Sequence, residues 1–203
     1  RAALIVCVTH SFKQTLIRRG VCASKIEVVL NGVNLDAYEP QPKDQTLLGN
    51  HNLAGKFVVG FLGTLGMAHA LDDVLVAAGL LREREDIVFL FAGSGASRDA
   101  LLKQSEELAL PNVIFIDRQP KPAMPALWSV CDVSLISLRN DPLFSTVIPS
   151  KIFESMGMGL PIILSLPEGE ASQIVRESGA GLVIEPQNPK QLAAVVAMLV
   201  EDS

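Results

Sequence analysis

The sequence predicts an α/β protein built on a doubly wound parallel sheet, and two observations carry this prediction. Short apolar runs rich in β-branched residues recur along the chain, and most are continuous rather than alternating, as in strands covered on both faces. Segments with apolar residues at helical spacing separate them, and such alternation is typical of a parallel sheet. Strands are expected at residues 4–9, 26–30, 56–62, 87–92, 112–116, 132–138, 161–164 and 181–185.

Local signals place two of the intervening helices. Over 71–78 apolar residues recur at helical spacing, and two aspartates fall in the first turn, where the helix dipole favours negative charge. The last helix has the clearest start, because Asn188 is an N-cap, Pro189 takes the first helical position and Gln191 falls at the capping-box place. Its buried side is expected to consist of Leu192, Val195, Val196 and Leu199. Right-handed crossovers put every strand-to-helix loop at one edge of the sheet, where ligands are expected.

Composition and charge exclude several classes of protein. The 203 residues are 49% hydrophobic and 19% charged, which is typical of a globular chain that needs no disulfide or metal to complete its core. Seventeen Lys and Arg against 22 Asp and Glu give a net charge of −5 without a basic stripe, so no nucleic-acid partner is expected. The three histidines lack metal-ligand spacing, so no metal site is expected.

The cysteines and apolar stretches indicate the compartment. Cys7, Cys22 and Cys131 are widely separated and lie in or near apolar stretches, so we interpret them as buried thiols in a reducing compartment and expect a cytoplasmic protein. The longest apolar stretches are far too short for a membrane span, and no secretory signal is visible. Because the first residue is arginine, we expect a fragment of a longer protein.

A polar, proline-containing stretch over 39–55 divides the chain. We therefore expect a strand–helix–strand unit at 1–39, a linker at 40–55 and the main α/β block at 56–203. One strand pair with one helix cannot bury a core, so the first unit should be the tail of another domain.

Two glycine-containing loops follow strands of the main block. The loop at 60–66 is either a phosphate cradle or a turn that packs strand against helix, and spacing alone leaves both open. The loop at 93–98 begins like a dinucleotide fingerprint, with Asp117 where a ribose-binding acid would lie. Arg98 replaces the third glycine, so we favour a tight turn capped by Ser97.

The third loop carries the most information. The polar segment 140–149 leads to Ser150, which can cap a helix, and Lys151 then falls in the first turn, where a cation is unfavourable unless an anion compensates it. Glu154 lies one turn along on the same side. A lysine for a diphosphate and a carboxylate for ribose hydroxyls form one coherent site. The alternative is a surface Lys–Glu pair.

The order of the motifs resembles that of a known family. The segments that carry the resemblance are 27–40 with Val-Val-Leu-Asn-Gly-Val-Asn inside it, 59–63, 91–95, 112–115, 131–133, 149–154 followed by 159–163, 169–171 and 179–183. They resemble the retaining, family-four glycosyltransferases of GT-B fold, most closely the group 1 transferases that build bacterial surface polysaccharides such as O-antigen or capsule. The resemblance implies that the main block is the Rossmann-like, donor-binding C-terminal domain and that 1–39 ends the acceptor-binding domain.

The resemblance also implies roles for particular residues. Glu154 corresponds to the second glutamate of the family's Glu-x7-Glu motif and should accept hydrogen bonds from ribose hydroxyls. Lys151 should add charge at the diphosphate, and the backbone near Arg118 should flank the nucleobase. The backbone amides expected to face the diphosphate are those around Ser150 and Ile152 and those of Gly63, Thr64 and Gly66.

Two departures from the family pattern affect these roles. Thr146 stands where the first glutamate of the motif would fall, so contacts to the donor sugar are open. Thr64 and His69 stand in place of the usual phosphate-binding arginine and lysine, and Lys151 and Arg118 are expected to supply that charge.

The function implied by the resemblance is transfer of a hexosyl or N-acetylhexosaminyl unit, with retention, from a nucleoside-diphosphate sugar to a glycan or lipid-linked acceptor. No cofactor is expected, and the isolated chain should be inactive without its own N-terminal acceptor-binding domain. A lipid-linked acceptor implies peripheral association with the inner face of the membrane. Three alternatives stay open: a GT-B epimerase or hydrolase, a dinucleotide-dependent oxidoreductase that uses Asp117, and a non-catalytic scaffold, for which Thr146 and Thr64 are the best evidence.

Overall fold

The structure is a computed structural model that describes residues 2–202, so the outer ends of the predicted first and last units, residues 1 and 203, lie outside it. Within residues 2–202 all eight predicted strands are present, with ends that differ by a few residues. A small parallel sheet consists of β1 (Ile5–Cys7) and β2 (Ile26–Val28). The main sheet consists, in spatial order, of β5 (Val113–Ile116), β4 (Ile87–Ala92), β3 (Phe57–Leu62), β6 (Val133–Ser137), β7 (Ile162–Ser165) and β8 (Gly181–Ile184).

Every pair of neighbouring strands in the main sheet is parallel, which confirms the doubly wound α/β prediction. The chain proceeds from β3 outward to β5 and then returns to form β6 on the other side of β3. This reversal is the topological switch point of a Rossmann-like sheet, and ligands bind there outside the carboxyl ends of the strands. A ligand-binding site is therefore expected at the loops that follow β3 and β6.

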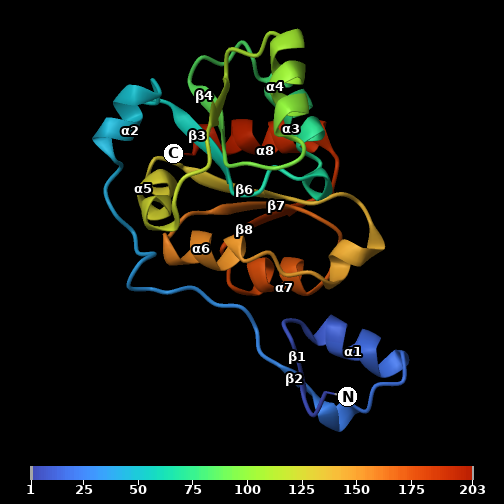
Figure 1. Ribbon diagram of the computed structural model, residues 1–203. Coiled ribbons are helices and arrows are strands. Elements are labelled where there is room, and N and C mark those ends of the chain that lie inside the picture. Colours follow the sequence, from blue (N-terminus) through green and yellow to red (C-terminus); the bar gives the residue numbers. More distant parts are fainter. Residues whose placement is uncertain (1, 203) are drawn as a thin grey trace.

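Helices cover both faces of the main sheet (Figure 1). They are α2 (Gln45–Asn50), α3 (Leu71–Leu80), α4 (Arg98–Glu107), α5 (Met124–Ser129), α6 (Lys151–Gly157), α7 (Glu170–Glu177) and α8 (Pro189–Glu201). Helix α1 (His10–Arg18) lies instead beside β1 and β2 in the N-terminal unit (Figure 1). Short 3₁₀ turns are η1 (Ala23–Lys25), η2 (Met67–His69), η3 (Lys121–Ala123) and η4 (Pro142–Thr146). Helices α3, α4 and α8 bury one core, and α2, α5, α6 and α7 bury the opposite face.

The two cores explain the continuous apolar strands. Successive side chains of a strand point to opposite faces of the sheet. In β3, Val59 and Phe61 enter the core under α3 and α8, while Val58 and Leu62 enter the core under α2 and α5. Both faces of the main sheet are covered and exclude water at β3, so apolar residues occur along the whole strand.

The segment expected to be a linker at 40–55 is only partly a connector. It contains α2, and Leu48 and Leu53 are buried in the same core as Val58. The Lys43 ammonium also lies 2.7 Å from a carboxylate oxygen of Asp132, just before β6. The second half of this segment therefore packs as a layer of the main block.

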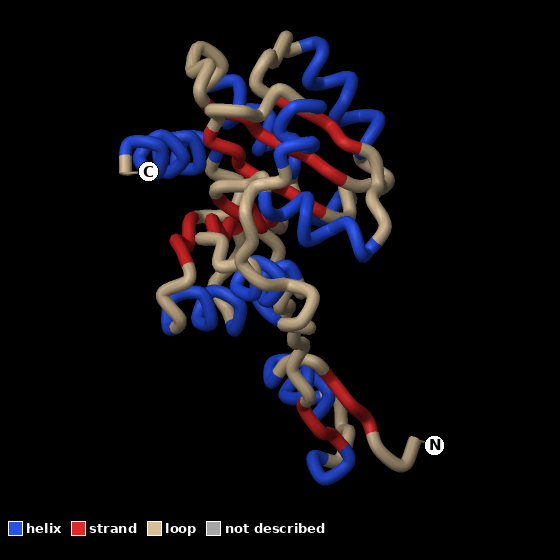
Figure 2. The backbone as a smooth tube through the Cα atoms, turned by 90° about the vertical axis from the view of Figure 1, so that its left-hand side faces the viewer, coloured by secondary structure: helices blue, strands red, loops and turns tan. Residues whose placement is uncertain are grey.

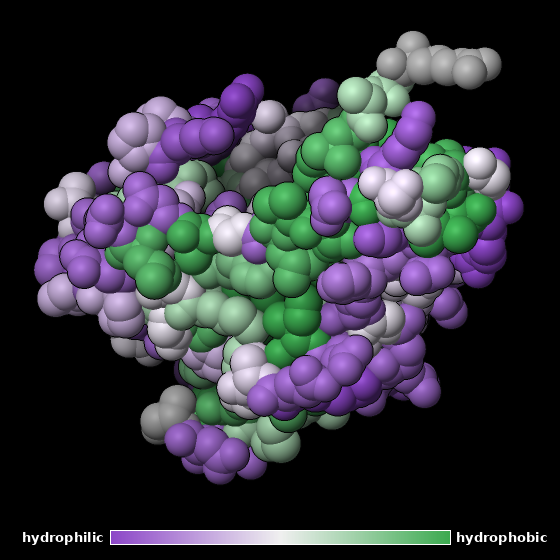
Figure 3. All heavy atoms as spheres, turned by 90° about the horizontal axis from the view of Figure 1, so that it is seen from below, coloured by the Kyte–Doolittle hydropathy of each residue, from purple (hydrophilic) through white to green (hydrophobic). Residues whose placement is uncertain are grey.

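The N-terminal unit stands apart from the main block and is joined to it by an extended segment (Figure 2). Large apolar side chains of this unit are exposed, among them Val6 at 58%, Val29 at 59% and Leu35 at 66%. In the view from below, apolar residues gather on the side of the molecule that carries the N-terminal unit (Figure 3). Among residues 2–39, only Thr9 and Ile26 are buried, in keeping with a strand pair that has no core of its own.

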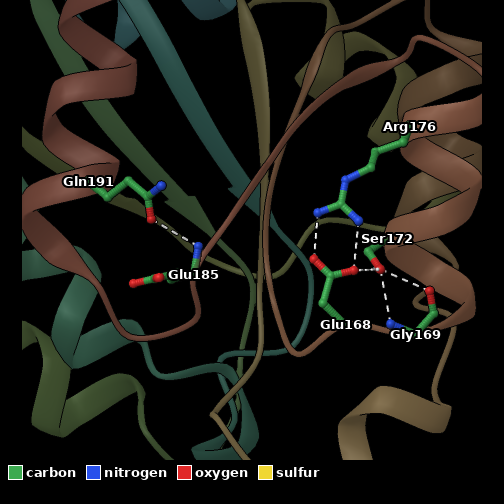
Figure 4. A network of polar contacts seen from close by, with 6 residues as sticks. All are labelled: Glu168, Gly169, Ser172, Arg176, Glu185 and Gln191. Atoms are coloured by element: carbon green, nitrogen blue, oxygen red, sulfur yellow. Dashed lines mark hydrogen bonds and ion pairs between the residues drawn. The ribbon is translucent and has the colours of Figure 1, made fainter.

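Three helix starts differ in detail from expectation. Asn188 caps α8 by accepting from the Gln191 amide at 3.0 Å, as predicted. The Gln191 side chain, however, accepts from the Glu185 amide rather than completing a capping box (Figure 4). Neither the Ser97 nor the Ser150 side chain caps its helix, because both residues already have helical backbone angles that point the hydroxyl away from the free amides.

The predicted buried side of α8 is confirmed in part. Leu192 and Val196 are buried, and Val195 and Leu199 pack against the same core while partly exposed. The cysteine interpretation is also only partly right. Cys131 is buried and Cys7 half-buried, but Cys22 is exposed, because it lies in the turn before η1, outside any core.

Candidate functional site

The loops after β3 and β4 pack directly on each other. The Gly63 amide donates to the Ala92 carbonyl at 2.7 Å, and the Leu65 amide donates to the Ser94 carbonyl at 2.9 Å. Gly93 has a φ of +147°, and a Cβ there would lie 1.7 Å from the Gly63 carbonyl oxygen. Glycine is therefore required at this position by packing alone. The packing role of the first loop is thus realised, and the same loop also borders open space.

Two adjoining clefts open at this edge of the sheet. The first, of about 800 Å³, lies between the two glycine loops and the segment that contains Arg118 and Lys121. The second, of about 660 Å³, lies between Lys121, the start of α6 and the segment 32–38. Gly63 and Thr64 border both clefts. A ligand with two parts joined by a narrow centre fits this arrangement.

Lys151 borders the second cleft and lies beside Gly63, which borders both clefts. Its Nζ atom is 3.6 Å from the centroid of the Phe61 ring, and a Cβ on Gly63 would lie 2.8 Å from the Lys151 Cε. The Nζ atom is shielded from solvent and has no hydrogen-bond partner among the described residues. Burial lowers the pKa of Lys151 to about 7, although the Glu154 carboxylate opposes this shift. A buried amine without a hydrogen-bond partner is not the surface ion pair that the sequence left open.

Glu154 faces the second cleft. Its Oε2 atom accepts a 3.4 Å hydrogen bond from the indole of Trp128, which is fully buried. Tyr38 lies across the cleft, and burial, followed by the charge of Glu154, raises the pKa of its hydroxyl. The carboxylate is therefore held at the cleft wall rather than in bulk water.

The start of α6 presents two backbone amides. The amides of Ser150 and Lys151 make no hydrogen bond within residues 2–202, and Ser150 borders the second cleft. The Ile152 amide instead donates to the Pro149 carbonyl at 3.1 Å, and its side chain is buried in the core. Ile152 is therefore not available to a ligand, contrary to expectation, because the first turn of α6 is tightened onto Pro149.

The first glycine loop differs from expectation in a similar way. The amides of Gly63 and Leu65 are used in the contact with the β4 loop, whereas those of Thr64 and Gly66 have no partner in the described part of the chain. Gly66 borders a small cavity of about 170 Å³ beside Arg139, away from both clefts. Thr64 is thus the residue of this loop whose amide can reach a ligand in the clefts.

Thr146 and His69, which replace charged residues of the family pattern, do not border either cleft. The Thr146 hydroxyl donates to the Leu143 carbonyl at 2.7 Å inside η4. The Nδ1 atom of His69 lies 2.9 Å from the Ser137 carbonyl, and its ring packs edge-on against Phe61. Burial, and then the charge of Lys151, lowers the pKa of His69.

The features of a dinucleotide site do not assemble. Asp117, at the place of a ribose-binding acid, forms an ion pair with Arg98. Asp117 therefore already has a cationic partner within the chain. This arrangement weakens the oxidoreductase alternative.

Sequence reasoning missed Phe61, Tyr38, Trp128 and Lys121. Phe61 lies between two glycines and reads as an ordinary strand residue, and Tyr38 and Trp128 are distant from Glu154 along the chain. The one available signal is that Trp128 is the only tryptophan of the sequence. Spacing cannot find such partners, because the fold alone brings them to the clefts.

No group of three or more His, Cys, Asp or Glu side chains within residues 2–202 comes close enough to hold a metal ion. None of the described helices is both long and apolar enough to cross a bilayer.

The sheet order, with clefts at its switch point, defines a doubly wound α/β domain of Rossmann-like fold. The sequence model of the family described as "Glycosyl transferases group 1" matches residues 56–202. The chain belongs to this family, and its main block has the fold of the C-terminal domain of a GT-B protein. The family and the fold class predicted from the sequence are confirmed.

Curated relatives agree with this assignment. The chain is 30% identical over 148 residues to the probable glycosyltransferase WbjE of Pseudomonas aeruginosa, covering 72% of this chain and 36% of that protein. It is 28% identical over 218 residues to spore coat protein SA of Bacillus subtilis, covering 99% of this chain and 56% of that protein. Two other relatives are named for teichuronic acid and colanic acid biosynthesis. The chain thus spans from about a third to just over half of the relatives it matches.

Solved structures show the same fold. Anabaena Alr3699/HepE, in complex with UDP and glucose, superposes with a TM-score of 0.84 at 22% identity, covering 99% of this chain and 54% of that one. The C-terminal domain of the group 1 protein LpcC from Francisella tularensis superposes with a TM-score of 0.68 at 20% identity, covering 84% of this chain and 88% of that one.

Proposed function

We propose that this chain binds a nucleoside-diphosphate sugar, with a UDP-sugar as the first candidate, across the two clefts. As part of a longer protein it transfers the sugar, with retention, to a glycan or lipid-linked acceptor. The observation that carries the proposal is the Lys151 side-chain nitrogen, which is buried at the second cleft beside Gly63 and has no hydrogen-bond partner among the described residues. An anionic group bound there would stabilise the charged form of this amine.

The surrounding groups suit the parts of such a donor. The amides of Thr64, Ser150 and Lys151 lie around the junction of the clefts and can donate to diphosphate oxygens. We assign Glu154 to the ribose hydroxyls and the backbone near Arg118 and Gln119 to the nucleobase. In the transfer reaction the diphosphate leaves with a growing negative charge, which fixed amide dipoles and an ammonium stabilise. We propose on this basis that donor binding requires no metal ion.

Calorimetric titration of the chain with UDP, GDP and ADP tests the proposal. We expect one of the three to bind, with unchanged affinity in EDTA. Substitution Glu154→Gln should weaken binding about 5- to 100-fold, the loss of charge-assisted hydrogen bonds. Glu177→Gln, on an exposed part of α7, is the matched control. Absence of binding for all three nucleotides, or full affinity of Glu154→Gln, overturns the proposal.

Trp128 supplies an independent readout. Its indole donates to Glu154, and it is the only tryptophan of the sequence, so ligand contact at Glu154 should change the intrinsic fluorescence. The same titration followed by fluorescence should give the calorimetric affinity.

A non-catalytic binding protein is the second candidate, and one observation favours it. Thr146 takes the place of a family glutamate, and its hydroxyl is committed to η4 rather than to a cleft. The full-length protein distinguishes the two functions. Release of UDP only in the presence of an acceptor supports transfer, whereas nucleotide binding without turnover of any donor supports the non-catalytic function.

A further inference from the structure

We propose that Lys151 is an uncharged amine in the empty clefts and takes up one proton when a donor diphosphate binds, and that Phe61 is the positioning residue that holds its Nζ atom beneath Gly63. The inference rests on the proposed function. It adds that binding is coupled to protonation, and that this coupling depends on an aromatic ring in the strand below.

The position of the amine is determined by its surroundings. Phe61 is 1% exposed and is fixed by an edge-on contact with His69, at 5.3 Å between ring centroids, and a tilted contact with Phe91 at 6.3 Å. Its ring face lies 3.6 Å from Nζ. The Gly63 backbone also lies next to this side chain, since a Cβ on Gly63 would be 2.8 Å from the Lys151 Cε and would force the end of the lysine to shift. The lysine therefore packs against both an aromatic ring and a stretch of backbone.

This enclosure favours the neutral amine. Burying an ammonium without hydrogen-bond acceptors is unfavourable, and a phenyl ring offsets only part of the lost hydration. Among residues 2–202, the Glu154 carboxylate from α6 acts on the charge of Lys151, and the charge of Lys151 in turn acts on His69 from η2. The Glu154 carboxylate favours the charged form of the amine, while burial lowers the pKa of His69, so its ring adds no charge near neutrality. Burial outweighs Glu154 and lowers the pKa of Lys151 to about 7.

A bound diphosphate reverses this balance. Its oxygens supply both the missing acceptors and a negative charge next to Nζ, so the ammonium becomes the stable form. The added proton comes from the buffer and binds the Nζ lone pair, and no bond of the ligand breaks. By linkage, affinity must fall as the pH rises above the pKa of the empty site, by up to about tenfold per pH unit.

Calorimetry in buffers of different ionisation enthalpy measures the proton directly. UDP-glucose is the probe, because its doubly esterified diphosphate has no titration near neutrality. We expect uptake of about 0.9 proton at pH 8 and about 0.1 proton at pH 6 for an empty-site pKa near 7. Binding without proton uptake at pH 8 overturns this inference and leaves the proposed function standing. No binding of UDP-glucose, and none of UDP, GDP or ADP, overturns both.

Variants separate protonation from structure. Lys151→Arg, whose guanidinium stays charged, should bind without proton uptake, and Lys151→Met should bind at least tenfold more weakly. Phe61→Leu should change the proton uptake at pH 7 and weaken binding about fivefold. The matched control is Phe91→Leu, which removes a buried ring from the same core without a contact to Lys151. If Phe61→Leu and Phe91→Leu show the same uptake and affinity, Phe61 is only structural.

Labelling the lysine Cε atoms with ¹³C tests the empty site without any ligand. The Lys151 signal, assigned by its loss in Lys151→Met, should titrate near pH 7. A Lys151 signal that does not titrate near neutrality overturns the inference. In Phe61→Leu this midpoint should move, and in Phe91→Leu it should not.

Discussion

The backbone amide of Ser11 donates a 2.6 Å hydrogen bond to Oε1 of Glu170, across 159 residues of sequence. The His10 amide donates to the other carboxylate oxygen at 2.9 Å. One side chain of α7 thus occupies the N-terminus of α1, where the helix dipole favours negative charge. This contact ties the N-terminal unit to the main block.

The position of Glu170 is itself fixed by its neighbours. The residues that precede Glu170 are held by hydrogen bonds (Figure 4). The Glu168 carboxylate accepts from Arg176 and from the Ser172 hydroxyl, and this hydroxyl also bonds the Gly169 backbone. A Cβ on Gly169 would lie 1.9 Å from the Ser145 carbonyl oxygen of η4. The start of α7 therefore contacts both α1 and the loop that leads to Lys151.

Glu170→Gln should release the start of α1. The neutral amide keeps one acceptor but loses the charge, so we expect faster hydrogen exchange of the His10 and Ser11 amides, by about fivefold for a loss of about 1 kcal/mol. Exchange measured by NMR or mass spectrometry checks this, with Glu177→Gln as control. Unchanged exchange at both amides would show that the Glu170 charge does not stabilise the start of α1.

The same contact should depend on pH. Partial burial raises the pKa of the Glu170 carboxyl, but the hydrogen bonds from Ser11 and His10 outweigh it, so the net shift is downward. A lowered pKa means that the stabilisation is complete above the unfolded-state value and is lost as the pH falls through the folded-state value. Protection of the α1 amides should therefore decline only in acid, and Glu170→Gln should abolish that dependence.

Glu168→Gln should have a small, acid-sensitive effect. Hydrogen bonds from Arg176 and Ser172 lower the pKa of Glu168 to about 2, so its contribution is complete above about pH 4.5 and is lost as the pH falls through about 2. The Arg176 and Glu168 side chains are 52% and 67% exposed, so screening limits the effect, and we expect a Tm decrease of about 2 °C at low salt. Thermal melts of both proteins at several pH values and salt concentrations measure it. A Tm difference between wild type and Glu168→Gln that persists well below pH 2 would contradict this role of the Glu168 carboxylate.

Gly93→Ala should destabilise the protein far more than Gly179→Ala. Both glycines have positive φ, but a Cβ at Gly93 would overlap the Gly63 carbonyl, whereas one at Gly179 meets nothing within 4 Å. We expect losses of about 4 and about 1 kcal/mol, respectively, in the free energy of unfolding. Urea denaturation measures both. Equal losses of unfolding free energy in the two variants would mean that the loops after β3 and β4 move apart readily to accommodate a Cβ.

Gly63→Ala and Gly66→Ala should differ in nucleotide binding. A Cβ on Gly63 displaces the Lys151 side chain, so we expect affinity to fall at least tenfold. Gly66 lies beside the small cavity near Arg139 and has an ordinary φ of −107°, so its substitution should leave affinity within about twofold. Calorimetry with the nucleotide that binds wild type compares them. A strong effect of Gly66→Ala would restore its predicted place at the diphosphate.

Much of the fold follows from local sequence. The strands are recognisable because both faces of the main sheet are buried, which makes β3 and β4 continuously apolar. The start of α8 is recognisable because Asn188 and Pro189 act within one turn. The loop 93–98 shows the limit of such signals, because its glycines, which look like a nucleotide fingerprint, are required by the backbone of the neighbouring loop.

The sequence by itself determined the order of strands and helices, the family and the identity of the loops that could carry a site. Only the tertiary structure decided that Lys151 packs on Phe61 beside Gly63 and that Trp128 contacts Glu154. It also decided that the Ile152 amide bonds Pro149 and that Gly66 lies away from both clefts. The hydrogen bond between Ser11 and Glu170 is likewise a product of the tertiary structure. The reason is physical. Periodicity and capping act between residues a few positions apart, whereas burial of a charge depends on which distant segments the sheet brings against it.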